Sequence, residues 1–486
     1  MNKDIRELEP KMVWNRFADL NAVPRASKKE GRVIRFMLDF GKRLGLETKE
    51  DEVGNVIIKK PASPGMENRK TVILQAHLDM VHQKNADTVF DFDTQGIDMF
   101  VDGDWVRARG TTLGADNGLG VATIMALLES ADIPHPALEA LFTIDEETGM
   151  TGAKGLKGGL LKGTVLLNLD TEDDDEIDIG CAGGIDVTAK GTYAEVEVPA
   201  DSTAFVVRVA GLSGGHSGMD IHKGLGNANK LMGSLLERGG GKFGLRISEW
   251  HGGGLRNAIP REGTAIVTLK GSDTTDFIDA FKEWAQGLMT EFALIDPKLN
   301  ITVGPAELPK KIMGADAQSD LLQAIGAAHN GVYAMSKTMD DLVETSNNIA
   351  KVSVENGSLT IACLTRSSVE SGKMELVGRL RAVFEKVGYE VELSGDYPGW
   401  EPDPDSDILR LLRSQYVELF KEEPRVVACH AGLECGILGQ NYPGMEMISF
   451  GPTIKGAHSP DERASIVSVQ KFWKYIQNIL KNIPEA

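Results

Sequence analysis

Histidine and acidic residues follow a series of apolar runs along this chain, and their distribution constrains the fold more than any other feature. They are His77 in LQAHLDM, Asp116 in TTLGADNG, Glu147 in TIDEETG, Asp170 in LLNLDTED and His458 in GAHSPDE. In open α/β sheets functional groups gather beyond the carboxyl ends of strands, where these residues fall. If His458 shares a site with His77, the first and last segments of the chain must form one domain.

The pattern of apolar residues changes twice and predicts where that domain is interrupted. Residues 1–184 alternate strand runs such as KTVILQAHLDM with helical stretches such as NGLGVATIMALLES, which is typical of an α/β fold. Residues 185–397 show alternating strands with interspersed helices, which predicts an inserted α+β domain, and residues 398–486 restore the first pattern. A length of 486 residues also exceeds one ordinary hydrophobic core. We therefore expect a catalytic α/β domain, 1–184 with 398–486, interrupted by a second domain, 185–397.

Composition excludes several classes of partner. The net charge of -19 repels phosphate backbones, so we expect no nucleic acid partner. No run approaches the roughly 18 apolar residues that would span a bilayer, which predicts no membrane insertion. The N-terminus is charged and amphipathic instead of signal-like, and the four cysteines form no CxxC pair. These features predict a soluble, cytoplasmic protein with reduced thiols.

Each candidate ligand also has an ordinary structural explanation. Side chains alternate between the two faces of a strand, so His77 and Asp79 point to the same face. Asp79 can therefore accept the second ring N–H of a metal-bound His77. The HxD pattern alone is nevertheless a weak signal. Asp116 stands just before a helical stretch, where an N-cap aspartate is common. Glu146 and Glu147 would form a solvated turn, unless one of them ligates a metal while the other takes a proton from water.

In combination the signals are specific. If Asp116 is shared by two metal ions, each ion has three protein ligands. One ion would have His77, Asp116 and Asp170, and the other would have Asp116, Glu147 and His458. Three protein ligands leave an open position, as catalytic zinc requires. Imidazole and carboxylate ligands without thiolate favour Zn²⁺, with Mn²⁺ or Co²⁺ as substitutes. We therefore expect a hydrolytic centre of two divalent ions, with Glu146 deprotonating a water that the ions acidify.

The motifs also resemble those of a known family. HLDM, GTTLGADNG, EETG, GCAGG, GGHSG, RNAIPRE, HAGLECG and GPTIKGAHSPDE, in this order, closely resemble the cytosolic Xaa-His dipeptidases, within the di-zinc aminoacylase and glutamate-carboxypeptidase-like peptidases. The resemblance covers nearly the whole chain. It implies a catalytic domain with a central mixed sheet between helices, an inserted lid domain, and free dipeptides, including Xaa-His and carnosine-like ones, as substrates.

The resemblance also implies roles for individual residues. The five ligand candidates fall on the family's metal positions, Asp79 and Glu146 fall on its catalytic positions, and a cis peptide bond is expected between Asp116 and Asn117. In the lid, His216 matches a histidine that stabilises the oxyanion, while Asn257 and Arg366 match a pair that binds the substrate carboxylate. Closure of the lid would bring His216 and Arg366 toward the metals. His222, His430 and Glu434 lie in matching motifs, but no role follows for them.

Alternatives remain open at this point. An N-acyl amino acid deacylase or a glutamate-type carboxypeptidase would use the same metals on a differently blocked substrate. A non-enzymatic peptide-binding protein would have lost a catalytic carboxylate, yet Asp79 and Glu146 are both present. Relatives form dimers, which makes a homodimer one expectation, and a long lid that completes the site within one chain is the other.

Overall fold

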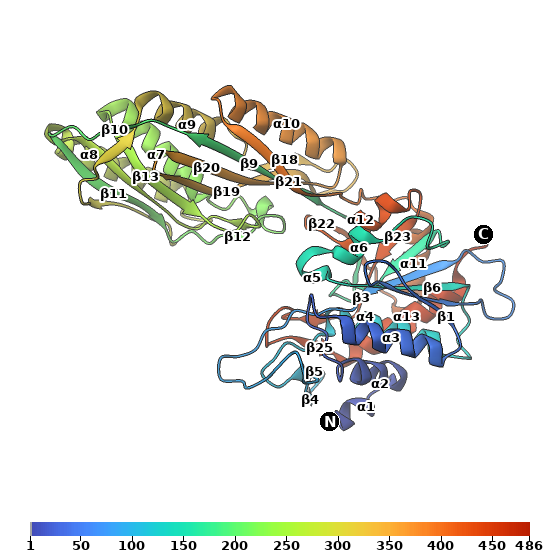
Figure 1. Ribbon diagram of the computed structural model, residues 1–486. Helices are drawn as coiled ribbons and strands as arrows, with labels where there is room; N and C mark the ends of the chain where they lie inside the picture. Colours follow the sequence, from blue (N-terminus) through green and yellow to red (C-terminus); the bar gives the residue numbers. More distant parts are fainter. Residues whose placement is uncertain (1) are drawn as a thin grey trace. The chain divides into compact units, whose positions relative to one another are not determined.

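The chain folds into two units, which we describe separately. The computed structural model describes residues 2–486. The first unit contains the described residues up to Gly180 together with Pro402–Ala428 and Leu433–Ala486, and the second contains Cys181–Glu401 and Cys429–Gly432. The colours in Figure 1 follow the sequence, so blue and red elements occur together in the first unit. Its two chain segments are therefore far apart in the sequence but belong to one fold.

An eight-stranded sheet forms the centre of the first unit. Its strands, in spatial order, are β1 (Glu47–Glu50), β2 (Val56–Lys60), β6 (Leu138–Thr143), β3 (Val72–His77), β7 (Val165–Asn168), β23 (Glu446–Ser449), β8 (Glu176–Cys181) and β22 (Arg425–Cys429). Strands β6, β3, β7 and β23 pair in parallel, whereas β1, β2 and β8 pair antiparallel. The parallel strands β3, β6 and β7 are buried along their whole length, which explains their unbroken apolar sequences.

Helices accompany this sheet. They are α1 (Lys3–Arg6), α2 (Lys11–Leu20), α3 (Gly31–Arg43), α4 (Ala115–Glu129), α5 (Glu146–Gly149), α6 (Thr151–Gly155), α11 (Asp407–Phe420), α12 (Glu434–Asn441) and α13 (Ile466–Asn482). Helix α4 is buried on all sides and packs against α2 and β3. It therefore lacks the polar face of a surface helix.

A smaller sheet of four strands joins the two segments of the first unit. Its order is β24 (Ile454–Lys455), β25 (Arg463–Ser465), β5 (Trp105–Ala108) and β4 (Met99–Asp102). Strand β25 pairs antiparallel with β5, so the loop that carries His458 is tied to the segment that precedes Asp116.

The second unit is built on a nine-stranded antiparallel sheet. Along the main path the order is β16 (Asn300–Pro305), β11 (Ser202–Ala210), β15 (Gly263–Lys270), β13 (Arg246–Gly253), β19 (Val343–Glu355), β20 (Ser358–Ser367), β9 (Gly183–Thr192) and β21 (Glu390–Tyr397), and β18 (Gly331–Met335) pairs with β19. The long helices are α7 (Ala228–Phe243), α8 (Thr274–Glu291), α9 (Ala315–Ala327) and α10 (Glu370–Lys386). Apolar side chains from these strands and helices form one core.

Short elements complete the second unit. They are the paired strands β12 (Gly215–His216) and β14 (Ala258–Ile259), the paired strands β10 (Glu195–Glu197) and β17 (Lys311–Met313), and the 3₁₀ turns η1 (Ile221–Lys223) and η2 (Gly271–Asp273).

The expected fold class is confirmed: the first unit is α/β with a mixed sheet, and the second is α+β. The strand expected at KTVILQAHLDM corresponds to β3, and the helix expected at NGLGVATIMALLES corresponds to α4. The second unit begins at Cys181 and its main segment ends at Glu401, slightly outside the expected 185–397, and it also takes in Cys429–Gly432. Within residues 2–486, no helix is both long and apolar enough to cross a membrane.

Candidate metal centre

The structure brings the five candidate ligands of the first unit together as two overlapping groups. His77, Asp116 and Asp170 form one group and Asp116, Glu147 and His458 form the other, each with its ligand atoms within 4.8 Å of one another. His77 Nε2 lies 3.1 Å from Asp116 Oδ1 and 3.5 Å from Asp170 Oδ1. His458 Nε2 lies 3.2 Å from Asp116 Oδ2 and 3.1 Å from Glu147 Oε2. Asp116 thus presents one oxygen to each imidazole.

The local folds explain how these side chains meet. His77 ends β3, Glu147 lies in the first turn of α5 after β6, and Asp170 follows β7 by two residues. Because β6, β3 and β7 are adjacent and parallel, their carboxyl ends lie at the same edge of the sheet. Asp116 lies at the start of α4, where its backbone is not helical, and its peptide bond to Asn117 is cis, as the resemblance implied.

His458 reaches the same edge from the last segment of the chain. Its backbone has a φ of 64°, in the left-handed region that residues with a side chain seldom adopt. Gly456, two residues earlier, has a φ of 69°. The loop between β24 and β25 therefore turns sharply on both sides of Ala457.

Asp79 contacts a member of each group, His77 and Glu147, and is completely buried. Its Oδ1 accepts the backbone N–H of Glu146 at 3.0 Å, and its Oδ2 accepts that of Glu147 at 3.3 Å and the hydroxyl of Ser27 at 2.8 Å. His77 Nδ1 is 3.1 Å from the Asp79 backbone carbonyl and 3.4 Å from Oδ1. Asp79 therefore contacts both the ligand on β3 and the backbone of the Glu146–Glu147 pair.

Electrostatics at this edge favour bound cations. Burial lowers the pKa of His77, but the carboxylates of Asp170, Asp116 and Asp79 outweigh it and raise that pKa well above its usual value. Hydrogen bonds to Asp116 and Glu147 raise the pKa of His458 to about 11. Burial raises the pKa of Glu146 well above its usual value, and Asp170 adds to this rise. So much negative charge requires compensation by positive charge.

The donor atoms also fit two divalent ions. Each group offers one imidazole nitrogen and carboxylate oxygens, the ligand types of catalytic zinc sites. In addition, the buried Glu147 Oε1 has no hydrogen-bond partner among residues 2–486. A buried carboxylate oxygen without a partner is costly unless a ligand occupies it.

The three expected lid residues all lie in the second unit. His216 Nδ1 accepts the backbone N–H groups of Gly218 (3.2 Å) and Met219 (3.1 Å). Burial and the charge of Arg366 lower the pKa of His216, so the ring is neutral at pH 7. A neutral ring with Nδ1 as acceptor carries its proton on Nε2 and can donate it.

Asn257 lies just before β14, and Arg366 lies on β20 of the same unit. The Asn257 carbonyl accepts the Ser217 N–H at 2.8 Å, next to His216. Arg366 Nη1 donates to the Tyr397 hydroxyl at 2.8 Å, while its buried Nε has no partner among residues 2–486. Arg366 therefore keeps donor capacity for an acceptor such as a carboxylate.

A buried polar layer beside the metal-ligand groups was missed by sequence reasoning. Gln75 Nε2 donates to Thr143 Oγ1 (3.1 Å) and Glu434 Oε2 (2.7 Å), Asn168 Nδ2 donates to Gln75 Oε1 (2.5 Å), and Ser449 Oγ donates to Asn168 Oδ1 (2.5 Å). Thr143, Gln75, Asn168 and Ser449 lie on the adjacent strands β6, β3, β7 and β23, and Glu434 is the first residue of α12. A polar residue inside an otherwise apolar run, such as Gln75 in VILQAH, is the signal that could have found the layer.

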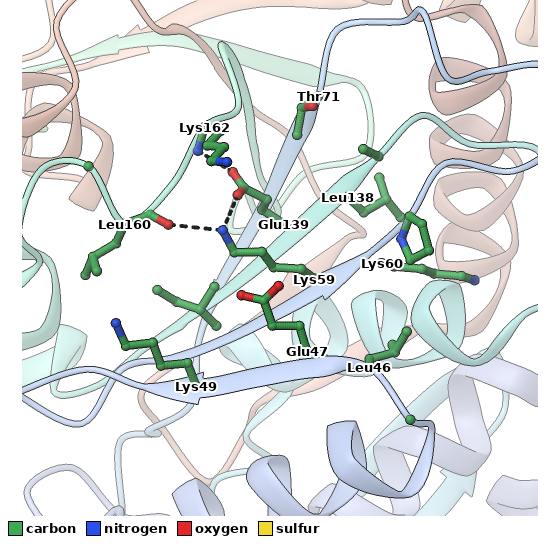
Figure 2. Close-up of a pocket in the computed structure, with 15 residues that line it drawn as sticks. Leu46, Glu47, Lys49, Lys59, Lys60, Thr71, Leu138, Glu139, Leu160 and Lys162 are labelled. Atoms are coloured by element: carbon green, nitrogen blue, oxygen red, sulfur yellow. Dashed lines mark hydrogen bonds and ion pairs between the residues drawn. The ribbon is translucent and has the colours of Figure 1, made fainter.

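A separate pocket of about 690 Å³ opens on β1, β2 and β6 and contains none of the predicted site residues. Figure 2 shows Lys59 beside Glu139 within it. Glu139 Oε1 accepts from Lys59 Nζ at 2.7 Å, and Oε2 accepts the backbone N–H groups of Lys162 (2.7 Å) and Gly163 (2.9 Å). The buried carboxylate in this pocket thus has its partners within the protein.

Comparisons with known proteins agree with this geometry. Residues 73–482 match the model of Peptidase family M20/M25/M40. The chain belongs to this family and is a metallopeptidase.

Two relatives are similar along the whole chain. The cytosol non-specific dipeptidase of Escherichia coli (strain K12) is 42% identical over 482 residues, which cover 99% of each chain. The crystal structure of aminoacylhistidine dipeptidase from Vibrio alginolyticus matches with a TM-score of 0.94 and 43% identity over 99% of this chain and 98% of that one. The aminopeptidase PepT from Bacillus cereus, 15% identical with a TM-score of 0.61 over 98% of this chain and 99% of its own, shares the fold.

Proposed function

We propose that this peptidase is a cytoplasmic dipeptidase that uses two divalent metal ions to hydrolyse free dipeptides, including Xaa-His and carnosine-like ones. The observation that carries the proposal is the position of Asp116 between two imidazoles, with Asp170 and Glu147 completing the two ligand groups. The names of the two similar dipeptidases support the substrate class.

The metal ions, when bound, would polarise the scissile carbonyl and lower the pKa of a water molecule. Glu146 is the proposed general base, because it adjoins the ligand Glu147 and its side chain joins His77 and Glu147 in a third close group. It would take a proton from the attacking water and pass it to the departing amine. The contacts of Asp79 with both backbone N–H groups would keep this base and its neighbouring ligand in place.

Residues of the second unit would bind the remaining polar groups of the substrate. His216, with its proton on Nε2, is suited to donate to the oxyanion that forms during attack. The guanidinium of Arg366 and the amide of Asn257 are suited to bind the carboxylate of a dipeptide. A carboxylate held one residue beyond the cut bond would restrict substrates to dipeptides.

The ligand chemistry favours zinc, with cobalt and manganese as substitutes. The test is hydrolysis of Ala-His, β-Ala-His, Gly-Gly, Ala-Ala-His and an N-acetyl amino acid by metal-stripped protein, with and without each metal. Zinc-dependent cleavage of the dipeptides but not of the tripeptide is the expected result. Cleavage of the N-acetyl substrate alone would contradict the dipeptidase assignment and favour a deacylase that uses the same metal ligands.

For the assembly, a homodimer is the proposal drawn from the family resemblance. Sedimentation velocity of the purified protein tests it, and a single monomeric species at micromolar concentration would contradict it.

A further inference from the structure

Glu462 lies four residues after His458, and its side chain binds the loop formed by residues 113–116, where α4 begins. Its Oε2 accepts the backbone N–H groups of Leu113 (2.7 Å) and Gly114 (2.9 Å), and its Oε1 accepts those of Ala115 (2.7 Å) and Asp116 (3.2 Å). The residue is only 2% exposed. Both carboxylate oxygens are therefore engaged by four successive backbone amides of one loop.

This contact joins two ligands that are distant in the sequence. The bound loop ends in Asp116, while the loop that carries Glu462 also carries His458, whose Nε2 lies 3.2 Å from Asp116 Oδ2. Directly after Glu462, β25 pairs with β5 and fixes the backbone on that side. Any displacement of the Glu462 carboxylate would shift the Asp116 loop relative to His458.

Arg25 holds the carbonyl groups of the same region. This guanidinium, 1% exposed, donates from Nη2 to the Gly114 carbonyl at 2.5 Å and from Nη1 to the carbonyls of Leu78 and Asp79, both at 3.1 Å. A Cβ on Gly114 would lie 2.6 Å from Nη2, and one on Gly118 would lie 2.5 Å from it. These two glycines leave the space that Arg25 occupies.

We infer that Glu462 is a positioning residue of the metal centre, because it fixes the Asp116 loop at the distance from His458 that a shared cation requires. The inference rests on the proposed function, in which Asp116 and His458 ligate metal. The structural alternative is that Glu462 only satisfies the unpaired N–H groups at the start of α4, as a helix cap does. The two roles differ in what they do to metal affinity.

The test compares Glu462→Gln with Glu139→Gln. Glu139 is a matched control, because it is also a buried carboxylate of the first unit that accepts successive backbone N–H groups. It lies at the amino end of β6, whereas the ligand Glu147 follows the carboxyl end of that strand. Zinc content and affinity are measured by competition with a chelating dye, and the melting temperature is measured with and without zinc.

Glu462→Gln should bind zinc about 10- to 100-fold more weakly, as supporting residues of metal ligands generally do when mutated. Its melting temperature should therefore rise less on zinc addition than that of the wild type. Glu139→Gln should lower the melting temperature of both forms equally and retain wild-type zinc affinity. Wild-type affinity in Glu462→Gln would overturn the inference.

A second variant separates geometry from charge and serves if Glu462→Gln does not fold. Glu462→Asp keeps the negative charge, but its shorter side chain cannot reach all four amides. Weakened zinc binding in Glu462→Asp supports positioning, and unchanged binding overturns it. If the wild-type protein itself binds no zinc, the proposed function fails, and that result is distinguishable from failure of the inference.

Discussion

Replacing Asp79 with asparagine should lower kcat/KM for dipeptides sharply while the protein remains folded. The carboxylate accepts hydrogen bonds from Ser27, from Glu146 N–H and from Glu147 N–H. An asparagine has one acceptor oxygen in place of two. The least costly orientation turns its NH₂ group toward Ser27, whose hydroxyl can reverse its role and accept.

That orientation still leaves the Glu147 N–H facing another donor. An unpaired buried donor costs about 1–3 kcal/mol, and loss of the charge from the bond to Glu146 N–H costs about 1 kcal/mol. The two costs add up to about 2–4 kcal/mol. If this free energy is lost from the positioning of Glu146 and Glu147, kcat/KM should fall about 30- to 800-fold.

The assay is steady-state hydrolysis of Ala-His with saturating zinc, together with thermal unfolding. Asp51→Asn is the matched control, because the Asp51 carboxylate also accepts three backbone N–H groups, those of Val53, Gly54 and Asn55, but belongs to neither ligand group. The control should lose stability and keep its turnover. A kcat/KM of Asp79→Asn within threefold of the wild type would refute the reasoning.

Three other results are expected. Glu146→Ala should keep both zinc ions and lose about 10²- to 10⁴-fold in kcat; normal turnover would exclude Glu146 as the base. Asp116→Ala should reduce binding at both zinc positions, whereas His458→Ala should weaken only one, so equal zinc content in the two variants would contradict a shared carboxylate. Burial, with the charge of Arg366, lowers the pKa of His430 to about 3, so the unfolded chain binds a proton below pH 6.5 that the folded chain does not. The stability from neutral His430 is therefore complete above pH 6.5 and is lost toward pH 3 by about 1.4 kcal/mol per pH unit. Urea unfolding measures the free energy of unfolding of the wild type and of His430→Gln, and the difference between them should change with this slope. A difference that stays constant with pH would contradict the prediction.

The strands of the first unit could be predicted because the parallel ones are buried on both faces and give continuous apolar runs. The apolar pattern did not predict β19 of the second unit, because Ser346, Asn347 and Asn348 are buried polar residues that interrupt it. Buried polar groups of this kind are explained by hydrogen bonds that only the folded structure reveals, such as that of Asn348 Nδ2 to the Ala258 carbonyl at 2.8 Å.

The ligand candidates were predictable for a similar reason. Each of them is a residue type that binds metal, and most follow an apolar strand, so their positions carry a signal in the sequence. Arg25 and Glu462 instead bind backbone N–H and carbonyl groups, which every residue possesses. No pattern of side chains in the sequence predicts such a contact, and only the distances in the folded chain reveal it.

The position of β23 in the sheet has a consequence for the order in which the protein forms during synthesis. This strand, Glu446–Ser449, lies between β7 and β8, both of which are made much earlier. A nascent chain that has not yet reached Glu446 therefore has a gap in its main sheet, and it also lacks His458. Such a chain has all the residues of the His77 group but lacks His458 of the other group, so ribosome-bound or truncated chains can assemble only one of the two ligand groups. Synthesis of Glu446–Ser449 and then of His458 closes the sheet and completes the second group.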